Sequence, residues 1–442
     1  MSGFEVQSLR HFVEDGAKEP PPFFVGRDSI INDIFTKARR AMEKQRAPAG
    51  NTRVIQGAPG AGKSALLSQI ERRCNVNHEA RVVKITNNLL ENHLTDVLLA
   101  IKIAATAQKE SWYAMFSKLG SAWGQRIGDV NAFGISADLS GLLNEAVPGD
   151  LMALKAQIPA KKFLFPVIVA IDEAQRLSPG KNTQHAQFLQ MIHDADDISL
   201  PLTTVLAGLG DTKERVHSIG ITYGLEAYSI GCLTWDEGQE LMQGWNQHFG
   251  IELGACQDKV NLLIAPTDGW PRHLHWAQTA LAEAALTVNG KLDLIQDWVC
   301  VFNKSNELRR GYYNWQYSDA MSDSNRLLAE IMLNIRKFEK KSQVVKRTTI
   351  IDWIEELRNQ RSEAAWQLPN GFDAHDYITH LIHRGALQEN YNPRSIACPI
   401  PSFQRFMITE GGGDIQKWPE PSNAENGWKR MSSKLINKIH NV

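Results

Sequence analysis

An octapeptide in the first part of the chain has the residue types that hold a polyphosphate. It consists of Gly57, Ala58, Pro59, Gly60, Ala61, Gly62, Lys63 and Ser64. Glycines let successive backbone N–H groups point at an anion, and the positive end of a following helix attracts it further. In this pattern the lysine reaches the β- and γ-phosphates of a nucleotide, and the final hydroxyl binds Mg²⁺. We therefore predict phosphate binding by Lys63 and metal binding by Ser64.

The segments on either side distinguish this loop from a chance glycine turn. Residues 52–56 (TRVIQ) have the composition of a short strand, and Ala65 begins the helical run ALLSQI. A strand, a glycine loop and a helix in this order are the context in which the pattern binds phosphate. We expect the nucleotide-binding segment to extend through Ala65.

Two adjacent carboxylates form the second chemical group. Asp172 and Glu173 follow residues 163–171 (FLFPVIVAI), a continuous apolar run that suits a parallel strand buried on both faces. Ligands of α/β sheets bind at the carboxyl ends of the strands. We predict that Asp172 holds Mg²⁺ and that Glu173 polarises the water that attacks the γ-phosphate. The alternative is that the pair simply caps the next helix.

The pattern around these residues predicts an α/β layered domain up to about residue 232. Strands are expected at 52–56, 81–85, 163–171 and 203–207, and helical segments alternate with them. Residues 128–139 alternate and contain glycines, which predicts an inserted hairpin. From the capping-box sequence at 234–237 (TWDE) the pattern is helical to about 336. Beyond it we expect short helices at 350–357, 373–380, 381–387 and 402–408, and a strand at 395–400.

Length and composition narrow the class of protein. The chain has 442 residues, too many for one ordinary core, and 43% hydrophobic with 22% charged residues is typical of a soluble globular protein. The net charge of −1 gives no global nucleic-acid signature, so a basic surface must be local. Five widely spaced cysteines indicate neither a zinc site nor a disulfide framework, which fits a cytoplasmic location. No signal peptide and no bilayer-spanning run is evident.

The two chemical groups together resemble the AAA+ superfamily over roughly residues 23–285. The similarity is greatest to origin-recognition-type proteins, transposition regulators and the STAND signalling ATPases. Residues 172–175 (DEAQ) are similar to the form found in transposition-type members. The segment with Val25, Gly26 and Arg27 resembles the box that packs around adenine. The resemblance implies an α/β P-loop NTPase core, a helical lid, and ATP and Mg²⁺ as cofactors.

Later segments resemble the sensor regions of the same superfamily. Residues 269–272 (GWPR) are similar to the lid motif, which makes Arg272 the arginine that reaches the γ-phosphate. Residues 206–210 resemble the sensor 1 strand, although the expected polar residue is not evident, and Thr204 and Asp211 are the alternatives. Where relatives often carry an arginine finger, this chain has Tyr223, and Arg215 is the nearest substitute. Slow hydrolysis or a nucleotide-controlled switch is therefore expected.

Residues 340–410 resemble a winged-helix domain. The basic segment 336–347 carries Arg336, Lys337, Lys340, Lys341, Lys346 and Arg347, which could follow a DNA backbone or form a solvated helix face. The expected organisation is a leader (1–22), an α/β nucleotide-binding domain (23–232), a helical lid and linker (233–335), a winged-helix-like domain (336–410) and a tail (411–442).

Three functions remain open on this basis. The leading hypothesis is a Mg²⁺-dependent ATPase whose ATP or ADP state controls assembly on a partner, with DNA as the expected partner and with homo-oligomers. The second is a STAND-like switch in signalling or phage defence that acts on a protein. The third is an accessory ATPase of a membrane or secretion machine.

Overall fold

The computed structural model of the chain describes residues 4–15, 21–44, 50–106, 148–158, 162–193, 200–317, 325–369, 371–391 and 394–410. The chain divides into two compact units. The first, here called the sheet unit, comprises Arg27–Gln56 and Lys63–Ser229. The second, the helical unit, comprises Met1–Gly26, Gly57–Gly62 and Ile230–Val442. The predicted hairpin at 128–139 and the tail at 411–442 lie outside the described residues.

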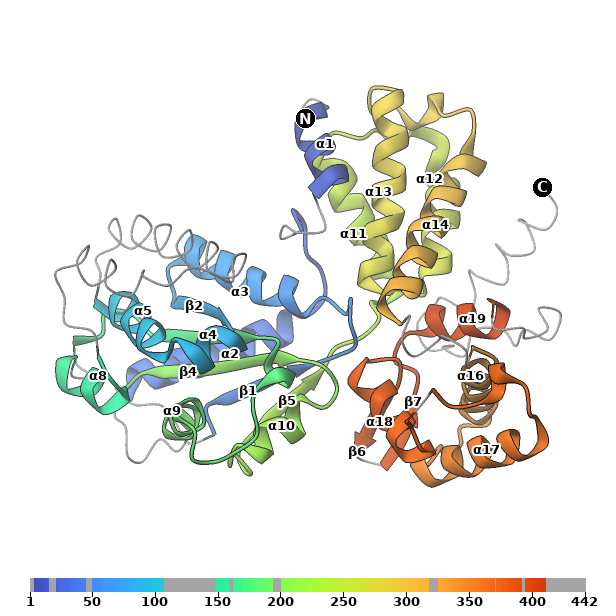
Figure 1. Ribbon diagram of the computed structural model, residues 1–442. Helices are drawn as coiled ribbons and strands as arrows, with labels where there is room; N and C mark the ends of the chain where they lie inside the picture. Colours follow the sequence, from blue (N-terminus) through green and yellow to red (C-terminus); the bar gives the residue numbers. More distant parts are fainter. Residues whose placement is uncertain are drawn as a thin grey trace. The chain divides into compact units, whose positions relative to one another are not determined.

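A five-stranded parallel sheet forms the centre of the sheet unit (Figure 1), in the order β2-β3-β4-β1-β5. The four predicted strands are confirmed, except that the one expected at 163–171 begins only at Val167, and a fifth, β5, was not predicted. Strands β1 and β4 are buried along their whole length, because helices cover both faces of the sheet. The strands are β1 (Thr52–Gln56), β2 (Arg81–Thr86), β3 (Val167–Asp172), β4 (Leu202–Gly208) and β5 (Glu226–Ser229).

The helices of the sheet unit bury one apolar face each against this sheet. In α2 (Asp28–Glu43), for example, Ile30, Ile34 and Ala41 are buried at helical spacing. One core cluster of the unit packs residues of other helices, such as Leu98, with strand residues such as Val169 of β3. The remaining helices are α3 (Lys63–Asn77), α4 (Asn87–Asn92), α5 (Leu94–Thr106), α8 (Leu151–Gln157), η2 (Ala174–Arg176), α9 (Gln184–His193) and α10 (Thr212–Ser218).

In the helical unit, five helices pack as a bundle (Figure 1): α1 (Val6–Asp15), α11 (Trp235–His248), α12 (Gln257–Ile264), α13 (Pro271–Thr287) and α14 (Trp298–Gln316). The capping box predicted at Thr234 is confirmed, because the backbone N–H of Glu237 donates to Thr234 Oγ1 over 3.2 Å and the Glu237 carboxylate accepts from Thr234 N–H. The expected leader contains α1, whose Leu9 and Phe12 are buried in the core of the bundle.

Among its described residues, the last part of the helical unit contains four α-helices, the 3-10 helix η6 (Ala364–Trp366) and a hairpin. The two short helices predicted at 373–380 and 381–387 are one helix, α18, followed by Gly385 with φ of 74°. The predicted strand at 395–400 is shorter, and it pairs antiparallel with β6. Among the residues that the structure describes, no helix is both long enough and apolar enough to cross a bilayer. The elements are α16 (Asn325–Lys340), α17 (Arg347–Gln360), α18 (Ala374–His383), β6 (Gln388–Tyr391), β7 (Arg394–Ala397) and α19 (Pro401–Glu410).

Candidate nucleotide-binding site

The glycine loop lies between the end of β1 and the start of α3, as predicted. Within the helical unit, the carbonyl of Gly60 accepts a hydrogen bond of 3.1 Å from the backbone N–H of Arg272. Gly60 has φ of 84°, and a Cβ built on it would lie 2.7 Å from Cβ of Arg272 and 2.9 Å from Nε1 of Trp270. Only glycine fits both the backbone conformation and this close approach. The structure thus brings Arg272 next to the loop.

The turn that carries Arg272 is itself rigidly packed. Trp270 is fully buried and precedes Pro271, which occupies the first position of α13. The carbonyl of Gly269 accepts a hydrogen bond of 2.8 Å from the N–H of Leu233. The Arg272 guanidinium lies 5.2 Å from the centre of the Trp276 ring, and burial lowers its pKa. The side chain nevertheless remains cationic at neutral pH because arginine starts from a very high value.

In the sheet unit, Lys63 opens α3 and Asp172 ends β3. Burial lowers the pKa of Lys63 to about 8, while the charges of Asp172 and Glu173 act on it in the opposite direction. The two carboxylates are therefore close enough to the ammonium to interact with it. Ser64 is exposed in the first turn of α3. A hydroxyl and a carboxylate are oxygen ligands of the kind that Mg²⁺ prefers, so these residues fit the ion.

The Glu173 side chain is held by two neighbours that the sequence analysis did not assign. Oε2 of Glu173 accepts a hydrogen bond of 3.0 Å from Nε2 of Gln175 and pairs with Nε of Arg176, also at 3.0 Å. Oε1 of Gln175 accepts from the backbone N–H of Leu209, which follows β4, over 3.2 Å. Glu173 occupies the N-cap position of η2, as the alternative interpretation expects, but its side chain makes no capping hydrogen bond there.

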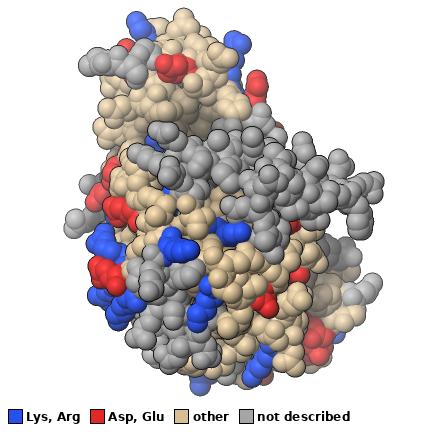
Figure 2. Space-filling view, turned by 90° about the vertical axis from the view of Figure 1, so that its left-hand side faces the viewer, with Lys and Arg blue, Asp and Glu red and all other residues tan. Residues whose placement is uncertain are grey.

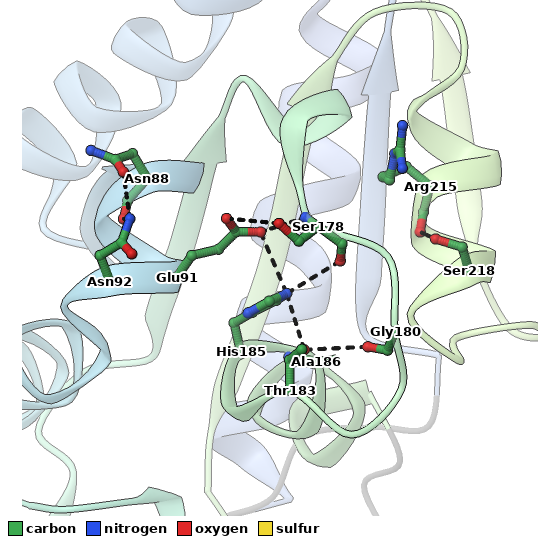
Figure 3. Close-up of polar contacts among 10 residues, drawn as sticks. All are labelled: Asn88, Glu91, Asn92, Ser178, Gly180, Thr183, His185, Ala186, Arg215 and Ser218. Atoms are coloured by element: carbon green, nitrogen blue, oxygen red, sulfur yellow. Dashed lines mark hydrogen bonds and ion pairs between the residues drawn. The ribbon is translucent and has the colours of Figure 1, made fainter.

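A polar cluster anchors the segment that follows Glu173 (Figure 3). Oε2 of Glu91 in α4 accepts a hydrogen bond of 3.2 Å from Oγ of Ser178, and Oε1 lies 3.5 Å from Nε2 of His185. The same ring nitrogen lies 3.1 Å from Oγ1 of Thr183. Since the Ser178 hydroxyl donates to the carboxylate and not to the imidazole, the cluster lacks an activated nucleophile. It positions the loop between β3 and α9 against the helix that follows β2.

The candidate residues for sensor 1 and for the arginine finger lie in different surroundings. Thr204 is fully buried in the middle of β4, opposite Thr52 of β1, and so lies away from the carboxyl end of the sheet. Asp211 directly precedes α10. Tyr223 is 61% exposed, and its ring packs edge-on against His193. Arg215 is half-buried in α10, and its carbonyl accepts a hydrogen bond from Ser218 (Figure 3).

The three residues of the predicted adenine box, Val25, Gly26 and Arg27, differ from one another in their surroundings. Val25 is buried in the core of the helical unit. Gly26 lies against Glu237, since a Cβ built on it would collide with the carboxylate. Arg27 precedes α2, and its carbonyl accepts hydrogen bonds from the N–H groups of Ile30 and Ile31.

The basic segment 336–347 is only partly a surface feature, which corrects the expectation that all of it could meet DNA. Arg336 is 2% exposed and donates to Oε1 of Gln404 over 3.0 Å. Arg347 donates to the carbonyl of His375 and pairs with Glu389. The exposed cations of the segment are Lys337, Lys340, Lys341 and Lys346. Figure 2 shows a face on which both charge signs occur and much of the described surface is uncharged.

Comparison with known proteins finds one family model and several similar solved structures. Residues 50–216 match the model of a protein family described as AAA domain. No curated protein matches the chain. Similar solved structures include the Aeropyrum pernix ORC2 protein, 12% identical with a TM-score of 0.49, covering 98% of this chain and 99% of that one. Drosophila ORC bound to DNA is 14% identical with a TM-score of 0.41, covering 93% and 100%.

A variant of Thermotoga maritima RuvB is 13% identical with a TM-score of 0.39, covering 87% of this chain and 95% of that one. The family match covers the glycine loop and strands β1 to β4. Residues 50–216 therefore match the AAA domain model, and the sheet unit has the α/β P-loop fold.

Proposed function

We propose that the protein binds Mg²⁺-ATP and hydrolyses it slowly. The observation that carries this proposal is that Lys63 begins the helix after the glycine loop, while Asp172 ends β3 at the carboxyl edge of the parallel sheet. The phosphates would bind loop residues 57–62, Lys63, Ser64 and Ala65, and Arg272 would contact the γ-phosphate. Val25, Gly26 and Arg27 would contribute to the adenine end.

In the reaction, the oxygen of a water molecule attacks the γ-phosphorus, and the bond to the β–γ bridging oxygen breaks. The water proton passes to Glu173, and ADP and inorganic phosphate leave. Bound Mg²⁺ would be held by Ser64 and Asp172 and would neutralise phosphate charge. Gln175 and Arg176 hold the Glu173 carboxylate in one orientation. Slow turnover is supported by Tyr223, which stands where relatives often carry an arginine finger.

We further propose that the nucleotide state controls assembly of this protein with itself and with DNA in the cytoplasm. Helices α16 to α19 with the β6–β7 hairpin resemble a winged helix, and the four exposed lysines of segment 336–347 would meet phosphate. Fold alone does not identify a partner, because winged helices also dock on proteins. The test therefore measures DNA binding. The competing hypothesis is a STAND-like switch that acts on a protein and does not bind DNA.

The experiment measures phosphate release and ATP binding for the full chain and for Lys63→Ala, with Mg²⁺ or EDTA. We expect Mg²⁺-dependent release by the wild type and no ATP binding by Lys63→Ala. Lys259→Ala, which removes an exposed lysine of α12, is the matched control and should behave as wild type. Tight ATP binding by Lys63→Ala would overturn the assignment.

Duplex DNA is then titrated at several salt concentrations with ATP and with ADP. The proposal requires an affinity that falls with salt and differs between the two nucleotides. Absence of DNA binding, together with ATP binding and slow hydrolysis, would favour the switch that acts on a protein.

A further inference from the structure

The turn before α13 is held by an ion pair with the last described helix. Arg405 of α19 contacts the carboxylate of Asp268, and the two side chains are only 11% and 8% exposed. Asp268 lies four residues before Arg272 and has a left-handed backbone with φ of 51°. If the two side chains move apart, each leaves a buried charge without compensation, which is costly. The contact therefore constrains the turn.

The residue after Arg272, His273, makes a second contact with α19. Nδ1 of His273 lies 2.7 Å from Oγ of Ser402 in α19, and the hydroxyl of Tyr313 in α14 donates to the same Oγ over 3.0 Å. Burial lowers the pKa of His273 well below its usual value, so the imidazole is neutral. Because Ser402 accepts from Tyr313, its own proton is available to Nδ1 of His273. The Ser402 hydroxyl thus links Tyr313 to His273 in a buried chain of hydrogen bonds.

Helix α19 also packs on other elements of the C-terminal part of the helical unit. Nε2 of Gln404 donates to the carbonyl of Met332 in α16 over 3.2 Å, and its Oε1 accepts from Arg336. The ring of Phe403 stacks on Tyr317, with centroids 4.2 Å apart. One face of α19 therefore packs on α16, while Ser402 and Arg405 reach the turn that carries Arg272.

We propose that Ser402 and Arg405 are positioning residues for Arg272. Through His273 and Asp268 they fix the backbone on both sides of Arg272, and so its place beside Gly60. A displacement of α19 by a ligand of the C-terminal part would then change the affinity for ATP through Arg272. The proposal rests on the proposed function, in which Arg272 contacts the γ-phosphate, a group that ADP lacks.

The test compares dissociation constants of a non-hydrolysable ATP analogue and of ADP for the full-length chain, with Mg²⁺ present. The variants are Arg272→Ala, Arg405→Met and their combination. We expect each single variant to weaken the analogue about tenfold relative to ADP, the effect of losing one charge-assisted hydrogen bond. The double variant should lose no more than Arg272→Ala alone, because both changes act through one contact.

Arg326→Met is the matched control, because it removes an exposed ion pair with Glu363 in the same part of the chain. It should leave both constants unchanged. Ser402→Ala and Tyr313→Phe each remove a single hydroxyl, and we expect smaller changes in the same direction should Arg405→Met fail to fold. Equal weakening of the analogue and ADP by these variants, or additive effects with Arg272→Ala, would overturn the positioning role. A wild-type chain that binds neither nucleotide would instead overturn the proposed function on which it rests.

Discussion

The backbone N–H of Leu209 donates a hydrogen bond to Oε1 of Gln175 across 3.2 Å. The amide nitrogen of the same side chain donates to Oε2 of Glu173. One glutamine therefore joins the carboxyl end of β4 to the carboxylate that follows β3. A change at the end of β4 can reach Glu173 through this side chain without any movement of the strands.

Gln175→Ala should lower the turnover of ATP while leaving its affinity nearly unchanged. The variant removes a hydrogen bond that orients Glu173, and a net loss of about 1 kcal/mol corresponds to a rate lower by roughly fivefold. Steady-state phosphate release measures both kcat and KM. Gln175→Glu should be slower still. A carboxylate at position 175 would repel the carboxylate of Glu173 and could not donate a hydrogen bond to it. A rise in KM without a change in kcat would contradict this role.

Glu173→Gln should retain ATP and lose hydrolysis. The amide keeps the size of the side chain but cannot accept the proton of the attacking water, and general-base catalysis contributes about 10²–10⁴-fold. Single-turnover hydrolysis and filter binding of labelled ATP separate the two effects. Asp258→Asn, an exposed acid of α12, is a suitable control. Unchanged turnover in Glu173→Gln would remove Glu173 from the mechanism.

ATP affinity should decrease as the pH rises above 8. In the free protein, burial lowers the pKa of Lys63 from 10.5 to about 8, so above that pH the side chain is largely neutral. Phosphate favours the ammonium and raises its pKa again, so binding takes up a proton and the affinity falls by up to about tenfold per pH unit in this window.

Isothermal titration in buffers with different heats of ionisation measures this proton uptake. Below pH 8, Lys63 is already charged in the free protein and should contribute no slope. Lys63→Arg provides the comparison, because arginine stays charged and should give a flat profile if it binds. A flat profile in the wild type would show that Lys63 is not the titrating contact.

Two kinds of basic residue in segment 336–347 should respond differently to substitution. Replacing Lys337, Lys340, Lys341 and Lys346 with alanine should weaken DNA binding and reduce the salt slope by about one unit for each phosphate that is no longer neutralised. Arg336→Met should instead lower the free energy of unfolding by about 1–3 kcal/mol, because it leaves Gln404 without its buried partner. Thermal unfolding and DNA titration of both variants separate these effects. An unchanged salt slope in the lysine variant would place the DNA-binding surface elsewhere.

Local patterns in the sequence were sufficient for the central strands and the glycine loop. Strand β1 was predicted at its observed bounds, because its flanking turn signals are strong. Strand β5 was missed: it is an edge strand of four residues whose side chains are exposed or half-buried, so it lacks an apolar run. The sequence does not distinguish helix α1 from a polar leader, because only a few apolar residues, such as Leu9 and Phe12, mark its buried face.

The parts of the candidate site that could not be predicted depend on contacts distant in sequence. Gln175 was noted as part of a motif, but its bond to Leu209 spans 34 positions. Arg336 was counted as a surface charge, because composition does not show that Gln404, 68 positions later, makes its burial tolerable. The roles of Gln175 and Arg336 are visible only in the tertiary structure.

The packing of α1 has a practical consequence for anyone who prepares this protein. Phe12 lies against the rings of Trp245, Phe249 and His275, with centroids 5.9, 5.1 and 4.9 Å away. A shortened chain that starts at the glycine loop, or even at residue 21, would leave these rings open to water and invite aggregation during expression. Material for biochemistry should retain the residues of α1, and purification tags are better attached elsewhere.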